Sequence, residues 1–369
     1  MPELENAFNP SRLTLARKRK GLTKSELARQ IGVDLRSVSA YEAGEYPPRE
    51  DTLNRITDVL GFEMEFFCGD DLEEPKSDTA SFRALSKMTA AQRDMALSQG
   101  AIALYVNKWL EEKFELPATA LPDLSHERSP EEAAETLRRH WGIGQLSIRN
   151  MIHLLEAKGV RVFSLAIDAR EVDAFSMWKE QRPFVFLNSM KSSEHSRYDA
   201  AHELGHLVLH RHAAPQGREA EREADMFASA FLMPRASVIA HAPKFPTLND
   251  LVNLKTLWTT SVAALTHRLH AVKMLSDWQY RTLCIQIAKN GFRIREPNGA
   301  PRETSQILPK ILAALYTDGF TRSRVAQVLS IPQSELEGLM FGLTIVSIEG
   351  GRKGPSSPKR AHLNLVDRN

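Results

Sequence analysis

Two histidines and a glutamate within one five-residue stretch could bind a metal ion and activate water. His202 and His206 are four residues apart, and Glu203 directly follows the first of them. On a helix, residues four apart lie on the same face, so both imidazoles can reach one ion. Glu203 lies beside them and can act as general base for a water at that ion. The stretch therefore predicts a hydrolytic metal site with Glu203 as the catalytic residue.

A catalytic zinc ion needs a third protein ligand, and a second acidic stretch can supply it. Two histidines with this spacing and a following glutamate are typical of zinc peptidases, in which three protein ligands leave one position open. Residues 219–234 follow a short loop and have the apolar spacing of a helix. We expect Glu221 to be the third ligand. Asp225, one turn further along the same face, is expected to accept a hydrogen bond from a ligand histidine.

Two neighbours of this motif are weaker candidates for the site. His210 is eight residues from His202, so on a continuous helix it points about 80° away and lies about 12 Å along the axis. We therefore expect His210 to be a polar residue near the end of the helix, where a histidine is favourable. Tyr198 could stabilise an oxyanion, although packing is its expected role.

The overall composition is that of an ordinary globular protein. Of the 369 residues, 42% are hydrophobic and 25% are charged, and the net charge of +2 gives no basic field over the whole surface. Cys68 and Cys284 are isolated, which argues against a disulfide framework and suits a reducing compartment. The sequence has no apolar run of about 18 residues and no signal-like start. These features predict a soluble, cytoplasmic protein without a membrane partner.

Shifts in composition divide the chain into five segments. At this length two or three domains are expected, and an acidic, proline-containing stretch separates the first from the rest. The predicted segments are an all-α N-terminal domain at 1–68, a linker at 69–79, a metal-binding domain at 80–275, a helical C-terminal region at 276–349 and a disordered tail at 350–369. The C-terminal region faintly echoes a helix-turn-helix, but its second helix carries Glu335 and Glu337 and no Lys or Arg. A structural or regulatory role is expected there, since phosphate contact needs basic residues.

The predicted fold is mainly α-helical with a small β-sheet, an α+β class. Residues 160–165 and 183–187 are expected to form short strands. A small sheet beside the metal-binding helix would suit a peptidase, because an extended substrate can add to its edge. Phe175 and Trp178 could line that groove, but an aromatic pair is more often part of the core.

The N-terminal segment has the pattern of a helix-turn-helix. Thr23 and Glu26 form a capping box that begins one helix, Gly32 permits a tight turn, and Asp34 can cap the next helix. Two helices joined by a short glycine-containing turn are the shape of this motif. Residues 9–67 resemble the XRE, or lambda repressor-like, DNA-binding family. The resemblance implies binding of double-stranded DNA, and a small helical protein-interaction module is the alternative.

The same resemblance implies which side chains meet the duplex, because the second motif helix enters the major groove. Arg36 could pair with a guanine edge, whereas Leu35 offers no hydrogen bond to a base and weakens the case for sequence specificity. The residues carried over by position as DNA-binding are Lys24, Leu35, Arg36, Ser37, Ser39 and Arg17. A basic patch for the phosphate backbone, or else a solvated helix face, is expected at Arg12, Arg17, Lys18, Arg19 and Lys20.

Further motifs surround the two metal-binding stretches. They lie at residues 137–144, 154–160, 175–178 and 182–188, and the acidic helix ends in Leu-Met-Pro at Pro234. Together they resemble the ImmA/IrrE family of zinc metallopeptidases over residues 130–275. The resemblance implies a zincin-like fold and one zinc ion on His202, His206 and Glu221, with Glu203 as base. Glu223 is the alternative third ligand, although the family's pattern favours Glu221.

The two resemblances together predict a DNA-binding transcriptional regulator with a zinc-dependent endopeptidase domain. The substrate would be a repressor or another regulatory protein in stress or mobile-element control. Glu203 favours an enzyme, because a structural metal site has no need of a base. The alternatives are a non-proteolytic regulator whose metal domain is structural or sensory, and an antitoxin whose C-terminal helices hold a partner. A homodimer would suit a two-fold operator.

Overall fold

The computed structural model describes residues 8–75, 81–82, 88–165, 174–212, 217–340 and 342–344. Within these residues the fold is mainly helical with one small sheet, which confirms the predicted α+β class. Part of the predicted linker and the whole predicted tail at 350–369 lie outside the described residues, and the segment boundaries stay predictions. None of the described helices combines the length and the apolar character that crossing a membrane requires.

Local caps begin the helices of the N-terminal segment. These helices are α1 (Pro10–Arg19), α2 (Lys24–Ile31), α3 (Leu35–Ala43) and α4 (Glu50–Leu60), followed by the 3-10 helix η1 (Met64–Cys68). Thr23 and Glu26 form the capping box of α2, and Asp34 accepts the amide of Ser37 at the start of α3. Gly32 makes the turn between the two helices with a φ of 68°, a left-handed conformation that favours glycine.

Four strands form one mixed sheet in the order β1-β3-β4-β2. They are β1 (Ser81–Phe82), β2 (Arg161–Ser164), β3 (Ala174–Lys179) and β4 (Arg182–Leu187). β3 and β4 form an antiparallel hairpin, β2 pairs in parallel with β4, and β1 pairs antiparallel with the other side of β3. The two strands expected from the sequence are present as β2 and β4. The sequence pattern does not predict β3, because this strand is mostly buried on both faces and lacks the alternation of polar and apolar residues.

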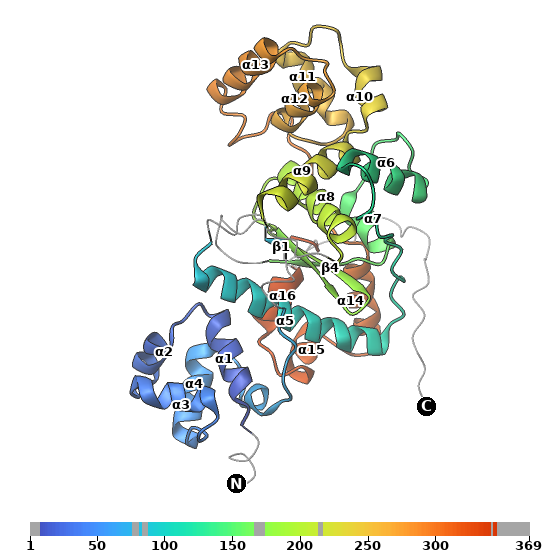
Figure 1. Ribbon diagram of the computed structural model, residues 1–369. Helices are drawn as coiled ribbons and strands as arrows, with labels where there is room; N and C mark the ends of the chain where they lie inside the picture. Colours follow the sequence, from blue (N-terminus) through green and yellow to red (C-terminus); the bar gives the residue numbers. More distant parts are fainter. Residues whose placement is uncertain are drawn as a thin grey trace, which may run out of the picture.

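Helices cover both faces of this sheet (Figure 1). α8 (Ser193–Leu209) and α9 (Arg218–Leu232) lie on one face, and α5 (Ala90–Lys113) lies on the other. Two shorter helices, α6 (Pro130–His140) and α7 (Met151–Ala157), contact α8. The rings of Phe175 and Phe186 stack in the core with their centroids 4.3 Å apart, so Phe175 packs inside the fold. α8 packs against β3 and β4 of this sheet.

The helices after α9 form two groups (Figure 1). The first group lies beyond α9 and comprises α10 (Arg235–His241), α11 (Leu248–Leu254), the 3-10 helix η2 (Lys255–Leu257), α12 (Val262–Ala271) and α13 (Asp277–Lys289). The second group returns to the side of the sheet that α5 covers and comprises α14 (Ile307–Thr317), α15 (Arg322–Val328) and α16 (Gln333–Met340). α16 also reaches the N-terminal helices, because its buried Glu335 pairs with Arg19 of α1 at 2.7 Å.

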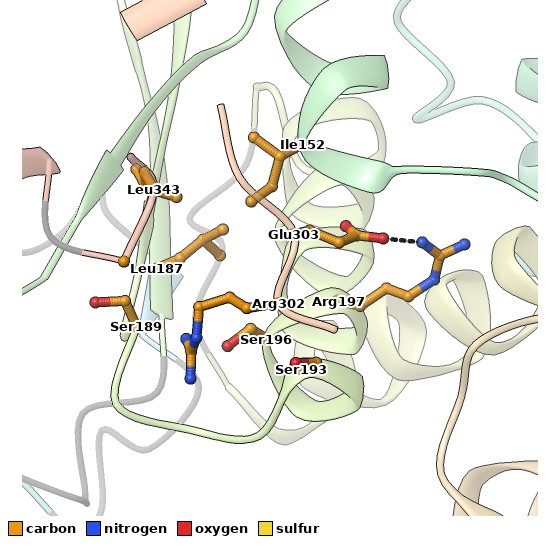
Figure 2. Close-up of a pocket in the computed structure, with 10 residues that line it drawn as sticks. Ile152, Leu187, Ser189, Ser193, Ser196, Arg197, Arg302, Glu303 and Leu343 are labelled. Carbon is orange, nitrogen blue, oxygen red and sulfur yellow. Dashed lines mark hydrogen bonds and ion pairs between the residues drawn. The ribbon is translucent and has the colours of Figure 1, made fainter. Parts of the chain in front are cut away.

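Buried ion pairs tie two segments that follow α9 to α8. Arg197 of α8 pairs with Glu303 beside a small pocket whose other walls include Leu343 (Figure 2). Lys255 and Glu194 pair at 3.0 Å, and each side chain is only 2% exposed. Such pairs specify geometry more than they add stability, because the cost of desolvation offsets much of the attraction.

Gly205 lies at the point where α8 and α9 approach each other closely. A methyl group at this position would lie 3.0 Å from Cδ1 of Phe227 and 3.3 Å from Cα of Ala224. Phe227 is fully buried and Ala224 Cα belongs to the backbone, so neither can move aside freely. The absence of a side chain at Gly205 therefore sets the spacing of the two helices.

Gly205→Ala is expected to lower the free energy of unfolding by about 1–2 kcal/mol, because overpacking outweighs the gain in helix propensity. Denaturant unfolding followed by circular dichroism measures this change. Ser25→Ala, on the exposed face of α2, serves as control and should change stability by less than about 0.5 kcal/mol. A Gly205→Ala protein as stable as wild type would show that the cost of overpacking does not exceed the gain in helix propensity.

Candidate functional site

The centre of α8 carries His202, Glu203 and His206 in a fully buried stretch. Ser192 caps the helix by accepting the amide of His195, and the helix then runs without interruption to Leu209. His202 and Glu203 are 0% exposed and His206 is 3% exposed. Buried polar groups of this kind require partners, which the neighbouring elements supply.

Three side chains converge on one point between α8 and α9. The Nε2 atoms of His202 and His206 lie 3.1 Å apart. Glu221 of α9 places Oε2 at 3.4 Å from Nε2 of His202 and Oε1 at 3.4 Å from Nε2 of His206. One ligand atom from each of the three residues lies within 4.8 Å of the others. The structure thus brings these three sequence candidates together.

Asp225 orients one of the two imidazoles. Its Oδ1 lies 2.9 Å from Nδ1 of His202, one turn of α9 beyond Glu221. A carboxylate at Nδ1 fixes the ring and directs Nε2 toward the point of convergence. The hydroxyl of Tyr198 donates to the backbone carbonyl of Asp225 at 3.0 Å. Tyr198 therefore contacts the backbone of α9 in this structure.

His210 and Glu223 orient the other imidazole, a role the sequence analysis did not assign to either. Nδ1 of His206 lies 3.0 Å from Nδ1 of His210, and Nε2 of His210 lies 2.9 Å from Oε2 of Glu223. His210 is the C-cap of α8, with φ −115° and ψ 30°, and lies four residues beyond His206. The spacing of four residues between His206 and His210 is the signal that could have found it.

Glu203 faces the sheet and accepts two hydroxyl hydrogen bonds. Ser81 of β1 and Ser176 of β3 donate to its Oε2 at 2.6 Å and 2.7 Å. Its Oε1 is buried without a hydrogen-bond partner among the described residues. Burial raises the pKa of Glu203 to about 7, against the opposing effects of His202 and of the two serine hydroxyls. A carboxyl group with this pKa can both take and give a proton near neutral pH.

Burial and pairing lower the pKa values of His206 and Glu221, which leaves the imidazole neutral and the carboxylate ionised at pH 7. Burial lowers the pKa of His206 to about 4, so its ring is neutral at pH 7. Burial alone would raise the pKa of Glu221, but hydrogen bonds and charges from His202 and His206 outweigh it and lower this pKa to about 2. Neutral imidazole and ionised carboxylate are the forms that bind metal ions.

The three converging residues fit a catalytic zinc ion. Two histidine nitrogens and one glutamate oxygen form a ligand set of zinc hydrolases, and tetrahedral coordination at about 2.1 Å needs ligand atoms separated by about 3.4 Å. The two Nε2 atoms are 3.1 Å apart, and each lies 3.4 Å from a different oxygen of Glu221, so the groups are close to this requirement. Oε1 of Glu221 is also buried and lacks a hydrogen bond among the described residues, so a cation would satisfy it.

Two family models match the chain over separate ranges. Residues 155–270, which contain β2, β3, β4, α8 and α9, match the IrrE N-terminal-like domain. Residues 13–67 match the Helix-turn-helix family. The chain joins a helix-turn-helix domain to an IrrE N-terminal-like domain. The IrrE N-terminal-like match suggests a metallopeptidase domain, and the helix-turn-helix domain is of a DNA-binding type. No curated protein gives a match to this chain.

In the helix-turn-helix domain, α3 presents its first turn to solvent. Leu35 is 50% exposed, Arg36 is exposed, and Ser37 and Ser39 are half-buried. Lys24 at the start of α2 lies 3.3 Å from Glu42 with 42% of its side chain exposed. These five residues lie on the two helices of the motif, on positions accessible to a duplex.

Three arginines of the expected basic patch serve the fold instead. Arg17 is buried and its guanidinium pairs with Glu42 and the Leu22 carbonyl, which corrects its assignment as a DNA contact. Arg12 is buried, donates to the Asp70 carbonyl and packs over aromatic rings. Arg19 pairs with Glu335. The sequence alone does not show that Arg17 and Arg19 pair with glutamates elsewhere in the chain.

Removing the imidazole of His210 is expected to weaken zinc binding by about 10–100-fold, because groups that orient a metal ligand typically contribute this much. The measurement is competition against a chelating indicator with purified His210→Ala. His212→Ala is the matched control, since the His212 side chain is 71% exposed. Equal zinc affinity of the two variants would contradict an orienting role for His210.

Proposed function

We propose that this protein is a DNA-binding regulator with a zinc-dependent endopeptidase activity. The observation that carries the proposal is the convergence of His202, His206 and Glu221 beside the buried carboxyl group of Glu203. The matches to helix-turn-helix and IrrE N-terminal-like domains support both halves of it. The expected substrate is a repressor or another regulatory protein, which the DNA-binding domain would bring close.

The side chains of this site divide the work of peptide hydrolysis. When bound, zinc would supply a Lewis acid for the scissile carbonyl and would favour deprotonation of the attacking water. Glu203 takes the proton from that water and gives it to the leaving amine, so one new carboxyl and one new amino group result. Ser176 holds Oε2 of Glu203 in place. Asp225 and His210 keep the two imidazoles directed at the ion.

A structural or sensory metal site is the second candidate function. The complete burial of His202 and Glu203 favours it, because a substrate cannot reach either residue while the described contacts persist. The two candidates differ in whether Glu203 matters to function. A structural site predicts loss of folding on metal removal and no proteolysis.

Glu203→Gln is expected to keep about one zinc per chain and to lose at least about a hundredfold in proteolysis, because an amide cannot accept the proton. Cleavage of a peptide library read by mass spectrometry, with zinc content from elemental mass spectrometry, measures both. His202→Ala and Glu221→Ala should lose zinc, whereas Glu219→Ala, on an exposed position of α9, should retain it. Equal cleavage by the Glu203→Gln protein would refute the mechanism.

Arg36→Ala is expected to weaken binding to a duplex selected by the wild-type protein from a randomised pool by about 1–3 kcal/mol, because Arg36 stands exposed on α3. Fluorescence anisotropy at fixed salt measures the affinity. Arg324→Ala on α15 is the control and should bind as wild type does. If both variants bind equally well, α3 does not read the DNA through Arg36.

A further inference from the structure

The chain's own segment at Ser81–Phe82 covers the edge of the sheet next to the candidate catalytic residue. β1 pairs Ser81 with Ser176 and Phe82 with Phe175, antiparallel to β3. In the strand order β1-β3-β4-β2, β3 would be the edge of the sheet without β1. The described pairing is only two residues long, so few backbone hydrogen bonds hold it.

The side chain of Ser81 enters the candidate site itself. Its hydroxyl donates to Oε2 of Glu203 at 2.6 Å, and its oxygen accepts the amide of Ser176 at 3.0 Å. Ser81 is 0% exposed, and so is Glu203. A residue that precedes the matched peptidase range by more than seventy positions thus closes the space beside the candidate base.

An extended peptide that adds to a sheet edge is a common mode of protein recognition. Main-chain hydrogen bonds provide affinity, and pockets for alternate side chains provide specificity. β1 has both features, since it extends the sheet at β3 and inserts one side chain beside Glu203. A substrate strand that brings a scissile bond to Glu203 would need this same edge.

We propose that the edge of β3 is the substrate-strand site of the peptidase and that the Ser81 segment is its resident occupant. This inference rests on the proposed peptidase function. The ligand class of the site is an extended peptide with a small hydroxyl side chain opposite Ser176. A substrate from another molecule binds only after it displaces the Ser81 segment.

Tethering makes the resident segment a strong competitor. Pro75 packs against α5, because a Cβ at Gly100 would lie 2.9 Å from its Cγ, and this contact holds the chain six residues before Ser81. A tethered ligand has an effective concentration on the order of millimolar. The apparent affinity for a free peptide is the intrinsic affinity multiplied by the fraction of molecules in which the site is open.

The test uses the full-length protein and a fluorescein-labelled synthetic peptide with the sequence of residues 75–89. Ser81→Trp places a large side chain in a slot that is 0% exposed, so it should expel the resident strand. The expected result is peptide binding about tenfold tighter than in wild type, measured by fluorescence anisotropy with EDTA present. Ser147→Trp, at an exposed position, is the matched control and should bind as wild type does. Equal affinity of all three proteins overturns the proposal.

A second peptide tests the specificity of the slot. The same peptide with Trp in place of the residue that corresponds to Ser81 should bind the Ser81→Trp protein at least about tenfold more weakly, because the slot has no room for it. Equal binding of the two peptides overturns the proposal. Circular dichroism checks folding, and Ser81→Leu replaces Ser81→Trp if the larger residue lowers the helical content.

The two proposals fail separately in these experiments. Peptide binding is measured without metal, so a protein that binds no zinc and cleaves nothing can still show the gain in Ser81→Trp. That result would refute the peptidase alone. Zinc-dependent cleavage that needs Glu203, with no gain in peptide binding, would refute the resident strand alone.

Discussion

The close crossing of α8 and α9 is the constraint on which the candidate site depends. Glu221 can meet His202 and His206 only because Gly205 lets the two helices approach. The same crossing brings Asp225 to His202 and Glu223 to His210. One small residue therefore places a ligand and two orienting carboxylates at once. Phe227 and Ala224 of α9 fill the space beside Gly205, so their packing fixes the spacing of the two helices.

The sheet matters to this arrangement because it supports the other side of α8. Ser176 of β3 contacts Glu203 on the side of the helix that meets the sheet. Trp178 donates to the backbone carbonyl of Leu207 at 3.0 Å, which anchors the next turn of α8 to the same strand. α8 is therefore held between a strand and a second helix. Both contacts act on neighbouring residues of the motif and limit how far Glu203 can move.

Local patterns in the sequence predict the helices, their caps and the facing pair of His202 and His206, because each depends on neighbours a few positions apart. The helix-turn-helix follows from Thr23, Gly32 and Asp34 in this way. Contacts between distant segments follow no such rule. The pairing of Ser81 with Ser176, the contact of Glu223 with His210, and the burial of Arg17 against Glu42 all depend on tertiary packing. Periodicity carries no information about these contacts.

The ion pair between Arg19 and Glu335 has a consequence for dividing the chain into pieces. These residues are 316 positions apart, yet each side chain is at most 10% exposed. A fragment that ended after α4 would leave Arg19 in water, and one that began at α5 would leave Glu335 without its counter-charge. The helix-turn-helix domain therefore contacts the last helices of the chain through this ion pair. Isolated domains would therefore differ from the intact chain at their shared boundary, even if each half folded alone.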